Sequence, residues 1–114
     1  MTDYKRLLTI QDISCVGQCS ATVALPVVSA FGTECAVYPT GVLSTHTAGF
    51  KGYTFRDLTD DFPAAIDHWK KEKIFFDSIY TGYLCGKAQI DCVKKCTELL
   101  TEDGKLIVDP VMAD

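Results

Sequence analysis

The sequence predicts an α/β fold in which a mostly parallel sheet is flanked by helices. Short apolar stretches, typical of buried strands, alternate along the chain with longer stretches that carry helix periodicity or helix start and stop signals. The connections between them are short, and this order is typical of parallel strands joined by helical crossovers. A chain of 114 residues has the usual size of one domain and can bury a real core.

The first half of the chain contains two predicted strands and one predicted helix. A short apolar run that ends in polar residues predicts a strand over residues 5–12. Residues 18–31 are apolar on nearly every side and predict a buried helix. Pro26 should kink or interrupt this helix, and Gly32 is placed to end it. Residues 35–39 are apolar and short enough for a second buried strand.

The second half continues the same alternation. A helix is predicted over residues 62–73, because two aspartates precede it, a proline occupies its first turn and lysines lie at its end. Residues 74–80 predict a third strand, and residues 87–100 predict an amphipathic helix. A turn over residues 101–105 should then lead to a fourth strand at residues 106–108.

Composition and charge exclude several classes of protein. The chain is 47% hydrophobic and 23% charged with a net charge of -4, which is typical of a soluble globular protein. No basic patch stands out, so we expect no nucleic-acid partner. No apolar run approaches ~18 residues, so we expect no membrane partner. The N-terminus lacks the apolar core of a signal peptide, and we therefore expect a cytoplasmic protein.

The cysteines allow more than one interpretation. The absence of a signal peptide favours reduced thiols over disulfides. Cys92 and Cys96 would share one face of a helix, where they are either small apolar residues in a core or the start of a metal site. The first alternative is favoured. Cys15 or Cys19 could act as a nucleophile near His46, although nothing in their spacing requires it.

Polar residues gather where the predicted strands end. Because ligands of open parallel sheets bind beyond the carboxyl ends of the strands, we expect these side chains to border a common crevice. They are Asp12 at the end of the first strand, Thr45, His46 and Thr47 after the second, Tyr83 after the third, and Asp109 and Asp114 after the fourth.

This set of residues suits a small aromatic heterocycle with polar substituents. Asp12 can accept a hydrogen bond from a protonated ring nitrogen, and residues 45–47 offer donors and acceptors to ring substituents. Tyr83 can stack on the ring or cover it. Asp109 and Asp114 supply oxygen ligands suited to magnesium that is carried by a nucleotide phosphate.

Each of these residues also has a purely structural interpretation. Asp12 could cap the following helix, and the hydroxyls of residues 44–47 could bond to the backbone of a turn. His46 could be an ordinary surface histidine, Tyr83 could serve packing alone, and Asp109 could simply end a strand. Composition and spacing leave these alternatives open.

Over nearly its whole length the sequence resembles the N-terminal half of bacterial pyridoxal (pyridoxine/pyridoxamine) kinases of the ribokinase-like superfamily. The resemblance is carried by LLTIQDISCVGQCSATVALPVVSAFG, GVLSTHTAGFKGYTFRDLTDDFPAAIDHW, SIYTGYLC and VDPVMAD, of which STHT and DPVMAD are the most specific. It implies a doubly wound fold in which residues 1–114 form the N-terminal, substrate-binding part of a single kinase domain. Such enzymes transfer the γ-phosphate of ATP to the 5′-hydroxymethyl group of the pyridine. They use magnesium, often with a monovalent cation, and commonly form homodimers.

The resemblance also implies roles for individual residues. Asp12 takes the position that meets the pyridine ring, where many relatives have Ser, and Leu43 takes a stacking position often held by Phe. The implied substrate-binding residues are Asp12, Leu43, Thr45, His46, Thr47 and Tyr83. Asp109 and Asp114 match carboxylates beside the nucleotide phosphates and the metal ion.

The family's catalytic machinery is expected outside this chain. Its Gly-rich anion hole and catalytic Asp, in a GxGD motif, lie downstream, so we expect no catalytic residue among these 114 residues and no activity from them alone. Two alternatives remain. One is a hydroxymethylpyrimidine kinase of the same superfamily, and the other is a non-catalytic ligand-binding or assembly module.

Overall fold

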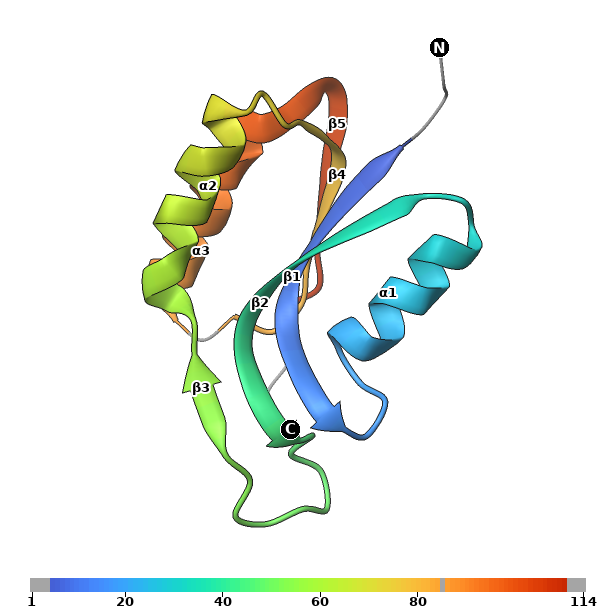
Figure 1. The fold of residues 1–114 in the computed structure, drawn as a ribbon, viewed down its shortest axis with the longest axis vertical. Helices are drawn as coiled ribbons and strands as arrows, with labels where there is room; N and C mark the ends of the chain where they lie inside the picture. The colour runs from blue at the N-terminus through green and yellow to red at the C-terminus, as the bar shows by residue number, and fades with distance from the viewer. Residues whose placement is uncertain (1–4, 85, 111–114) are drawn as a thin grey trace.

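A computed structural model describes residues 5–84 and 86–110 of the chain (Figure 1). It contains one five-stranded sheet, whose strands in spatial order are β3 (Phe55–Asp57), β2 (Glu34–Thr45), β1 (Arg6–Val16), β4 (Phe76–Thr81) and β5 (Leu100–Val108). Helix α1 (Ala21–Ala30) lies on one face of this sheet, and helices α2 (Phe62–Lys71) and α3 (Lys87–Cys96) lie on the other. The predicted α/β class is confirmed.

The four long strands run in one direction. Strand β1 pairs in parallel with both β2 and β4, and β4 pairs in parallel with β5. Their carboxyl ends therefore lie along the same edge of the sheet, as predicted. The short strand β3 is antiparallel to β2 and was not predicted, because its three exposed residues carry no apolar pattern.

Strands β1 and β2 extend further than their apolar runs. The prediction that the first strand ends at Asp12 is wrong, because pairing continues to Val16, which lies opposite Thr45. The second predicted strand, over residues 35–39, likewise continues to Thr45. Ladder hydrogen bonds join backbone groups, so polar side chains do not end a strand whose neighbour continues beside it.

Strand β2 contains a bulge near its middle. Gln11 lies opposite Pro39, and Ile13 lies opposite Val42, so β2 has one more residue than β1 over this interval. The extra residue falls at Thr40 and Gly41, directly after a proline that cannot donate to the ladder.

Helix α1 differs most from its prediction. It was expected to be buried, but Ala21 is its only buried residue, because the helix covers the sheet with one side alone. Pro26 was predicted to kink or interrupt the helix, and the helix is not interrupted there. Gly32 follows its end with a φ of +81°, so the predicted role of this glycine is confirmed. Ser20 occupies the N-cap position, so Asp12 does not cap this helix.

The core lies between the sheet and the pair α2 and α3. The ring of Phe62 stacks on Tyr38 with centroids 4.0 Å apart and an interplanar angle of 8°. Phe62 is fully buried, as are the strand residues Leu8, Ile10 and Ile79. Burial of such side chains contributes about 1.5–3 kcal/mol each, so this face supplies most of the stability.

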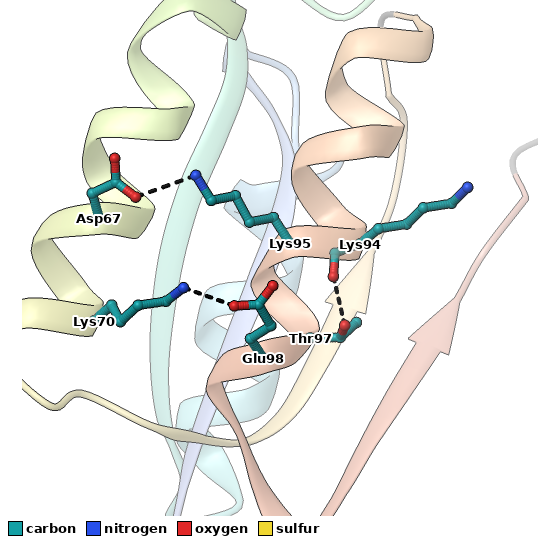
Figure 2. Close-up of polar contacts among 6 residues, drawn as sticks. All are labelled: Asp67, Lys70, Lys94, Lys95, Thr97 and Glu98. Carbon is teal, nitrogen blue, oxygen red and sulfur yellow. Dashed lines mark hydrogen bonds and ion pairs between the residues drawn. The ribbon is translucent and has the colours of Figure 1, made fainter.

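Two ion pairs join α2 to the segment formed by α3 and the short helix η2 (Thr97–Leu99) (Figure 2). The Nζ atom of Lys70 lies 2.7 Å from a Glu98 carboxylate oxygen, and the Nζ atom of Lys95 lies 3.2 Å from Asp67. All four side chains are exposed, and such pairs contribute little compared with the apolar contacts beneath them.

The chain leaves α3 earlier than predicted. The helix was expected over residues 87–100, but it ends at Cys96, and β5 begins at Leu100. Between the pairs Phe76–Leu100 and Ser78–Lys105, β5 contains three more residues than β4. Most of the predicted turn therefore bulges out of the ladder rather than preceding the strand.

The helices described in residues 5–84 and 86–110 are all too short or too polar to cross a bilayer.

Candidate functional site

A cavity of about 590 Å³ lies on the α1 side of the sheet, near the carboxyl ends of β1, β4 and β5. Its wall on the helix side is apolar, whereas the loops and strand ends contribute amide, hydroxyl, thiol and carboxylate groups. The lining residues are Gln11, Gln18, Cys19, Ser20, Val23, Ala24, Val27, Val28, Tyr80, Gly82, Tyr83 and Asp109. A mainly apolar wall with a few polar groups is typical of sites for small organic ligands.

The strand side of this cavity depends on close packing of Gln11 against Gly82. Gln11 is 5% exposed, and its side-chain amide donates a hydrogen bond to the Thr9 hydroxyl over 2.6 Å. A Cβ atom at Gly82 would lie only 2.6 Å from Gln11 Oε1. The amide of Gly82 donates to the Ile10 carbonyl over 2.9 Å, which fixes the chain where it leaves β4. A side chain at position 82 would therefore displace Gln11.

The structure brings two of the predicted site residues together. Tyr83 and Asp109 both line the cavity, although they follow different strands. The Asp109 amide donates to the Thr81 carbonyl over 3.1 Å, and the Tyr83 carbonyl accepts a hydrogen bond from the Thr40 hydroxyl over 3.3 Å. Both residues are thus held through their backbone, which leaves the half-exposed Tyr83 ring at the cavity. Asp114, the second predicted carboxylate, lies outside the described residues.

Asp12 and Leu43 lie on the opposite face of the sheet. The side chains of β1 alternate, so Asp12 shares the face of Ile10, whereas Gln11 faces α1. Ser14 donates to Asp12 Oδ2 over 3.2 Å, and Ser14 lies opposite Leu43 in the ladder. Asp12 and Leu43 are both buried, at 7% exposed. The described structure therefore does not bring them to the cavity of Tyr83 and Asp109.

His46 lies against the turn that follows β1. Its amide donates to the Val16 carbonyl over 3.1 Å, and its imidazole ring meets Phe50 edge to face at 4.9 Å. Gly17 has a φ of +96°, and a Cβ atom there would lie 2.0 Å from His46 Cδ2. Glycine at position 17 is thus needed for two reasons, its backbone conformation and the room it leaves for the imidazole.

The hydroxyl side chains beside His46 differ in their hydrogen bonds and in their exposure. The Thr45 hydroxyl donates to the His46 carbonyl over 2.9 Å, and Ser44 Oγ accepts from the Thr54 amide over 2.8 Å. These two bonds are the turn-type contacts that the structural alternative predicted. Thr47 is exposed. His46, Thr45 and Thr47 lie beyond the residues that line the 590 Å³ cavity.

Several cavity residues were missed from the sequence. Tyr80 could have been found by alternation, because Ile79 faces the core and its neighbour must therefore face α1. Gln18 and Ser20 lie in the connection before α1 and carry no pattern of their own. Val27 was expected on a buried helix, whereas it is 51% exposed and lines the cavity.

The cysteines of α3 are core residues. Cys92 and Cys96 are buried, and burial raises the pKa of the Cys96 thiol to about 12, so it stays protonated. Within residues 5–84 and 86–110, no three His, Cys, Asp or Glu side chains gather as metal ligands. Cys19 is exposed and lines the cavity.

Comparison with known proteins gives strong structural matches. No family model matches the sequence, and no curated protein matches it. A Bacteroides thetaiotaomicron protein, provisionally named a phosphomethylpyrimidine kinase, superposes with a TM-score of 0.92 at 38% identity, covering 99% of this chain and 39% of that chain. A crystal form of that protein with pyridoxal gives a TM-score of 0.91 at 39% identity, covering 98% and 39% of the two chains.

A second relative is named a pyridoxal kinase. The enzyme from Lactobacillus plantarum superposes with a TM-score of 0.88 at 34% identity, covering 96% of this chain and 39% of that chain. The chain therefore spans about two-fifths of the length of these relatives. The resemblance seen in the sequence is confirmed, and the chain has the ribokinase-like fold of pyridoxal kinases and of a phosphomethylpyrimidine kinase, over part of their length.

Proposed function

We propose that the intact protein is a kinase that transfers the γ-phosphate of ATP to the 5′-hydroxymethyl group of pyridoxal, pyridoxine or pyridoxamine. The observation that carries the proposal is the match over 96% of this chain to a pyridoxal kinase at 34% identity. The relative that was crystallised with pyridoxal, at 39% identity, adds support. In this proposal residues 1–114 form the N-terminal, substrate-binding part of a single kinase domain.

The proposed roles follow the chemistry of each side chain. Tyr83 covers the pyridine ring at the cavity, and His46 and Thr47 bond to its polar substituents. Thr45 shapes the segment that carries them, because its hydroxyl bonds to the His46 carbonyl. Asp12 and Leu43, which are buried behind this segment, are proposed to contact the ring only if the segment and the ends of the strands rearrange around the substrate.

Asp109 fits a role beside a magnesium–nucleotide complex. Magnesium is usually held by one or two carboxylates, with water and substrate phosphates completing its shell. Asp109 lines the cavity beside Tyr83 and can supply one such carboxylate. Asp114 is proposed to supply the second. When bound, magnesium would neutralise charge on the phosphate oxygens, while Asp109 would orient the phosphate end of the nucleotide.

The proposal assigns no catalytic base to this chain. Phosphoryl transfer needs a group that positions the attacking hydroxyl and donors for the γ-phosphate, which are proposed to lie in the remainder of the protein. The isolated 114-residue chain should therefore not phosphorylate pyridoxal. A cytoplasmic homodimer that uses a monovalent cation is also proposed, by analogy with such kinases.

Steady-state kinetics of the intact protein test the proposal. We expect His46→Ala to lower kcat/KM for pyridoxal by roughly 10- to 100-fold, which corresponds to about 1–3 kcal/mol for a lost buried hydrogen bond. The KM for ATP should not change. His68→Ala, on the exposed surface of α2, is the matched control and should behave as the unsubstituted protein. Unchanged pyridoxal kinetics in His46→Ala would remove His46 from the site.

A hydroxymethylpyrimidine kinase is the second candidate, because the Bacteroides thetaiotaomicron relative is provisionally named for a pyrimidine substrate. The two substrates differ in ring chemistry but present the same hydroxymethyl acceptor. Assays of the intact protein with pyridoxal and with hydroxymethylpyrimidine, under identical conditions, separate the candidates. A higher kcat/KM for the pyrimidine would overturn the pyridoxal proposal. Phosphorylation of neither compound would favour a non-catalytic module.

A further inference from the structure

A buried amide in α3 lies outside every residue group discussed so far. Gln89 is 1% exposed, and its Nε2 atom donates to the Thr40 carbonyl over 3.0 Å and to Thr59 Oγ1 over 2.9 Å. The other buried residues on the same side of the helix are Cys92, Val93 and Cys96, so Gln89 is the polar member of an otherwise apolar or thiol stripe. A polar side chain at such a position is costly unless it is hydrogen-bonded, so these bonds define its place.

Thr40 joins three further segments to this amide. Its carbonyl also accepts from the Leu58 amide over 3.0 Å, and its hydroxyl donates to the Tyr83 carbonyl over 3.3 Å. Thr40 lies in the bulge of β2, where the ladder to β1 is interrupted and a backbone carbonyl can turn toward another partner. One fully buried residue thus connects β2, α3, the end of β3 and the loop that carries Tyr83.

Thr40 is linked to both parts of the proposed substrate site. The segment of residues 44–54 starts four residues after Thr40 and returns through β3, which ends one residue before Leu58. The strand that leads into the segment of His46 and Thr47 therefore contains Thr40, and the strand that returns from it is followed by Leu58, whose amide bonds to the Thr40 carbonyl. The Thr40 hydroxyl bonds to the Tyr83 carbonyl, so Tyr83 is held by the same residue.

We propose that Gln89 is a positioning residue for the substrate site, which fixes the distance between Tyr83 and the segment of residues 44–54. The expected kinetic effect rests on the proposed function, whereas the hydrogen bonds of Gln89 do not depend on it. Gln89 touches no substrate in this proposal and acts through Thr40. Because a bulge carbonyl with one partner fewer can rotate, loss of the Gln89 amide should loosen both segments together.

The test uses Gln89→Leu in the intact protein, because leucine is similar in size and lacks the amide donor. The substitution removes the bonds to Thr40 and Thr59, and we expect the loss of the bond to Thr40 to raise the KM for pyridoxal roughly tenfold. The KM for ATP should stay within error of the unsubstituted protein. Thr40→Val keeps the carbonyl and removes only the bond to Tyr83, so its KM for pyridoxal should rise by less.

Val93→Ala is the matched control for a purely structural effect. Val93 lies on the same helix, is 5% exposed and packs in the core without a hydrogen-bonding side chain. Its loss should destabilise the fold without changing the KM for pyridoxal. If Gln89→Leu leaves that KM unchanged, or if Val93→Ala raises it equally, the proposal is overturned.

Amide hydrogen exchange separates this inference from the proposed function. In Gln89→Leu, exchange should accelerate in residues 44–54 and 82–84, and Val93→Ala should not show this pattern. The measurement needs no substrate, so it decides the role of Gln89 even if the protein phosphorylates neither pyridoxal nor hydroxymethylpyrimidine. Equal acceleration in the two variants, or none in Gln89→Leu, overturns the inference.

Discussion

The two faces of the sheet are packed to very different degrees. On the face of α2 and α3, aromatic and aliphatic side chains such as Phe62, Phe76 and Ile66 are at most 1% exposed. On the face of α1, Leu25 is 43% exposed and Phe31 is 83% exposed, and the 590 Å³ cavity lies between the helix and the strands. Figure 1 shows helices α2 and α3 against one face of the sheet and helix α1 against the other.

The two faces of the sheet therefore have different roles: one stabilises the fold, and the other presents the groups that are proposed to bind the ligand. The packed face carries the apolar core, whereas the open face carries Gln11, Tyr83 and Asp109 at the strand ends. Substitutions on the first face should change the free energy of unfolding. Substitutions at the strand ends should instead change substrate binding, with a smaller effect on unfolding.

The largest expected effect is that of Phe62→Ala. Removing a fully buried ring that stacks on Tyr38 should lower the free energy of unfolding by about 3–5 kcal/mol. The control on the open face is Leu25→Ala, which should change it by less than about 0.5 kcal/mol. Urea denaturation of both variants measures the difference, and similar losses would contradict the division between the two faces.

Gly17→Ala should have an intermediate effect on stability and a specific effect on His46. A non-glycine residue at a φ of +96° costs about 1–2 kcal/mol. Gly32→Ala shares a positive φ, of +81°, but no atom lies within 4 Å of the place that its methyl group would take, so it controls for backbone strain. Only Gly17→Ala should shift the imidazole NMR signals of His46 and raise the KM for pyridoxal. If the two variants give the same His46 signals, the contact between Gly17 and the imidazole has no consequence.

The smallest expected effect concerns Tyr38 and high pH. Burial, reinforced by the nearby negative charge of Asp61, raises the pKa of Tyr38 to about 12, and its hydroxyl donates to the Leu58 carbonyl over 2.6 Å. The folded state therefore holds this proton more tightly than the unfolded chain, whose tyrosine pKa is about 10. Stability from this group should be complete below pH 10 and should decline between pH 10 and about 12.

Tyr38→Phe isolates that contribution. At neutral pH it should lower the free energy of unfolding by about 0.5–1.5 kcal/mol, the net value of one hydrogen bond. The difference in the free energy of unfolding between Tyr38→Phe and the unsubstituted protein should become smaller as the pH rises from 10 to about 12. Denaturation curves at several pH values measure the gap, and a constant gap would mean that Tyr38 titrates equally in both states.

Much of the fold could be predicted from the sequence because its signals are local. The apolar stripe of α2 and the short apolar runs at β1 and β4 each identify their element, and the alternation of elements implies parallel strands. The prediction failed where non-local packing decides. Helix α1 has too few partners to be buried, and β2 continues past its apolar run because β1 lies beside it.

The candidate site was predicted less completely. The order of parallel strands correctly placed Tyr83 and Asp109 at one edge, because only the direction of each strand was needed. The face on which a side chain emerges depends on the exact register, which no local pattern reveals. Leu43 could therefore not be assigned to a face before the bulge in β2 was known, whereas the face of Asp12 follows from the regular alternation of β1.

That bulge has a consequence for sequence change as well as for structure. The additional residue at Thr40 and Gly41 reverses the alternation of β2, so that Leu43 lies opposite Ser14 rather than facing α1. Deleting one of these two residues would restore regular alternation and leave Leu43 opposite Ser14, but it would remove the bulge in which the Thr40 carbonyl meets the Gln89 amide. Replacements are restricted as well, because Thr40 is fully buried and a Cβ atom at Gly41 would lie 2.9 Å from the Arg56 carbonyl oxygen.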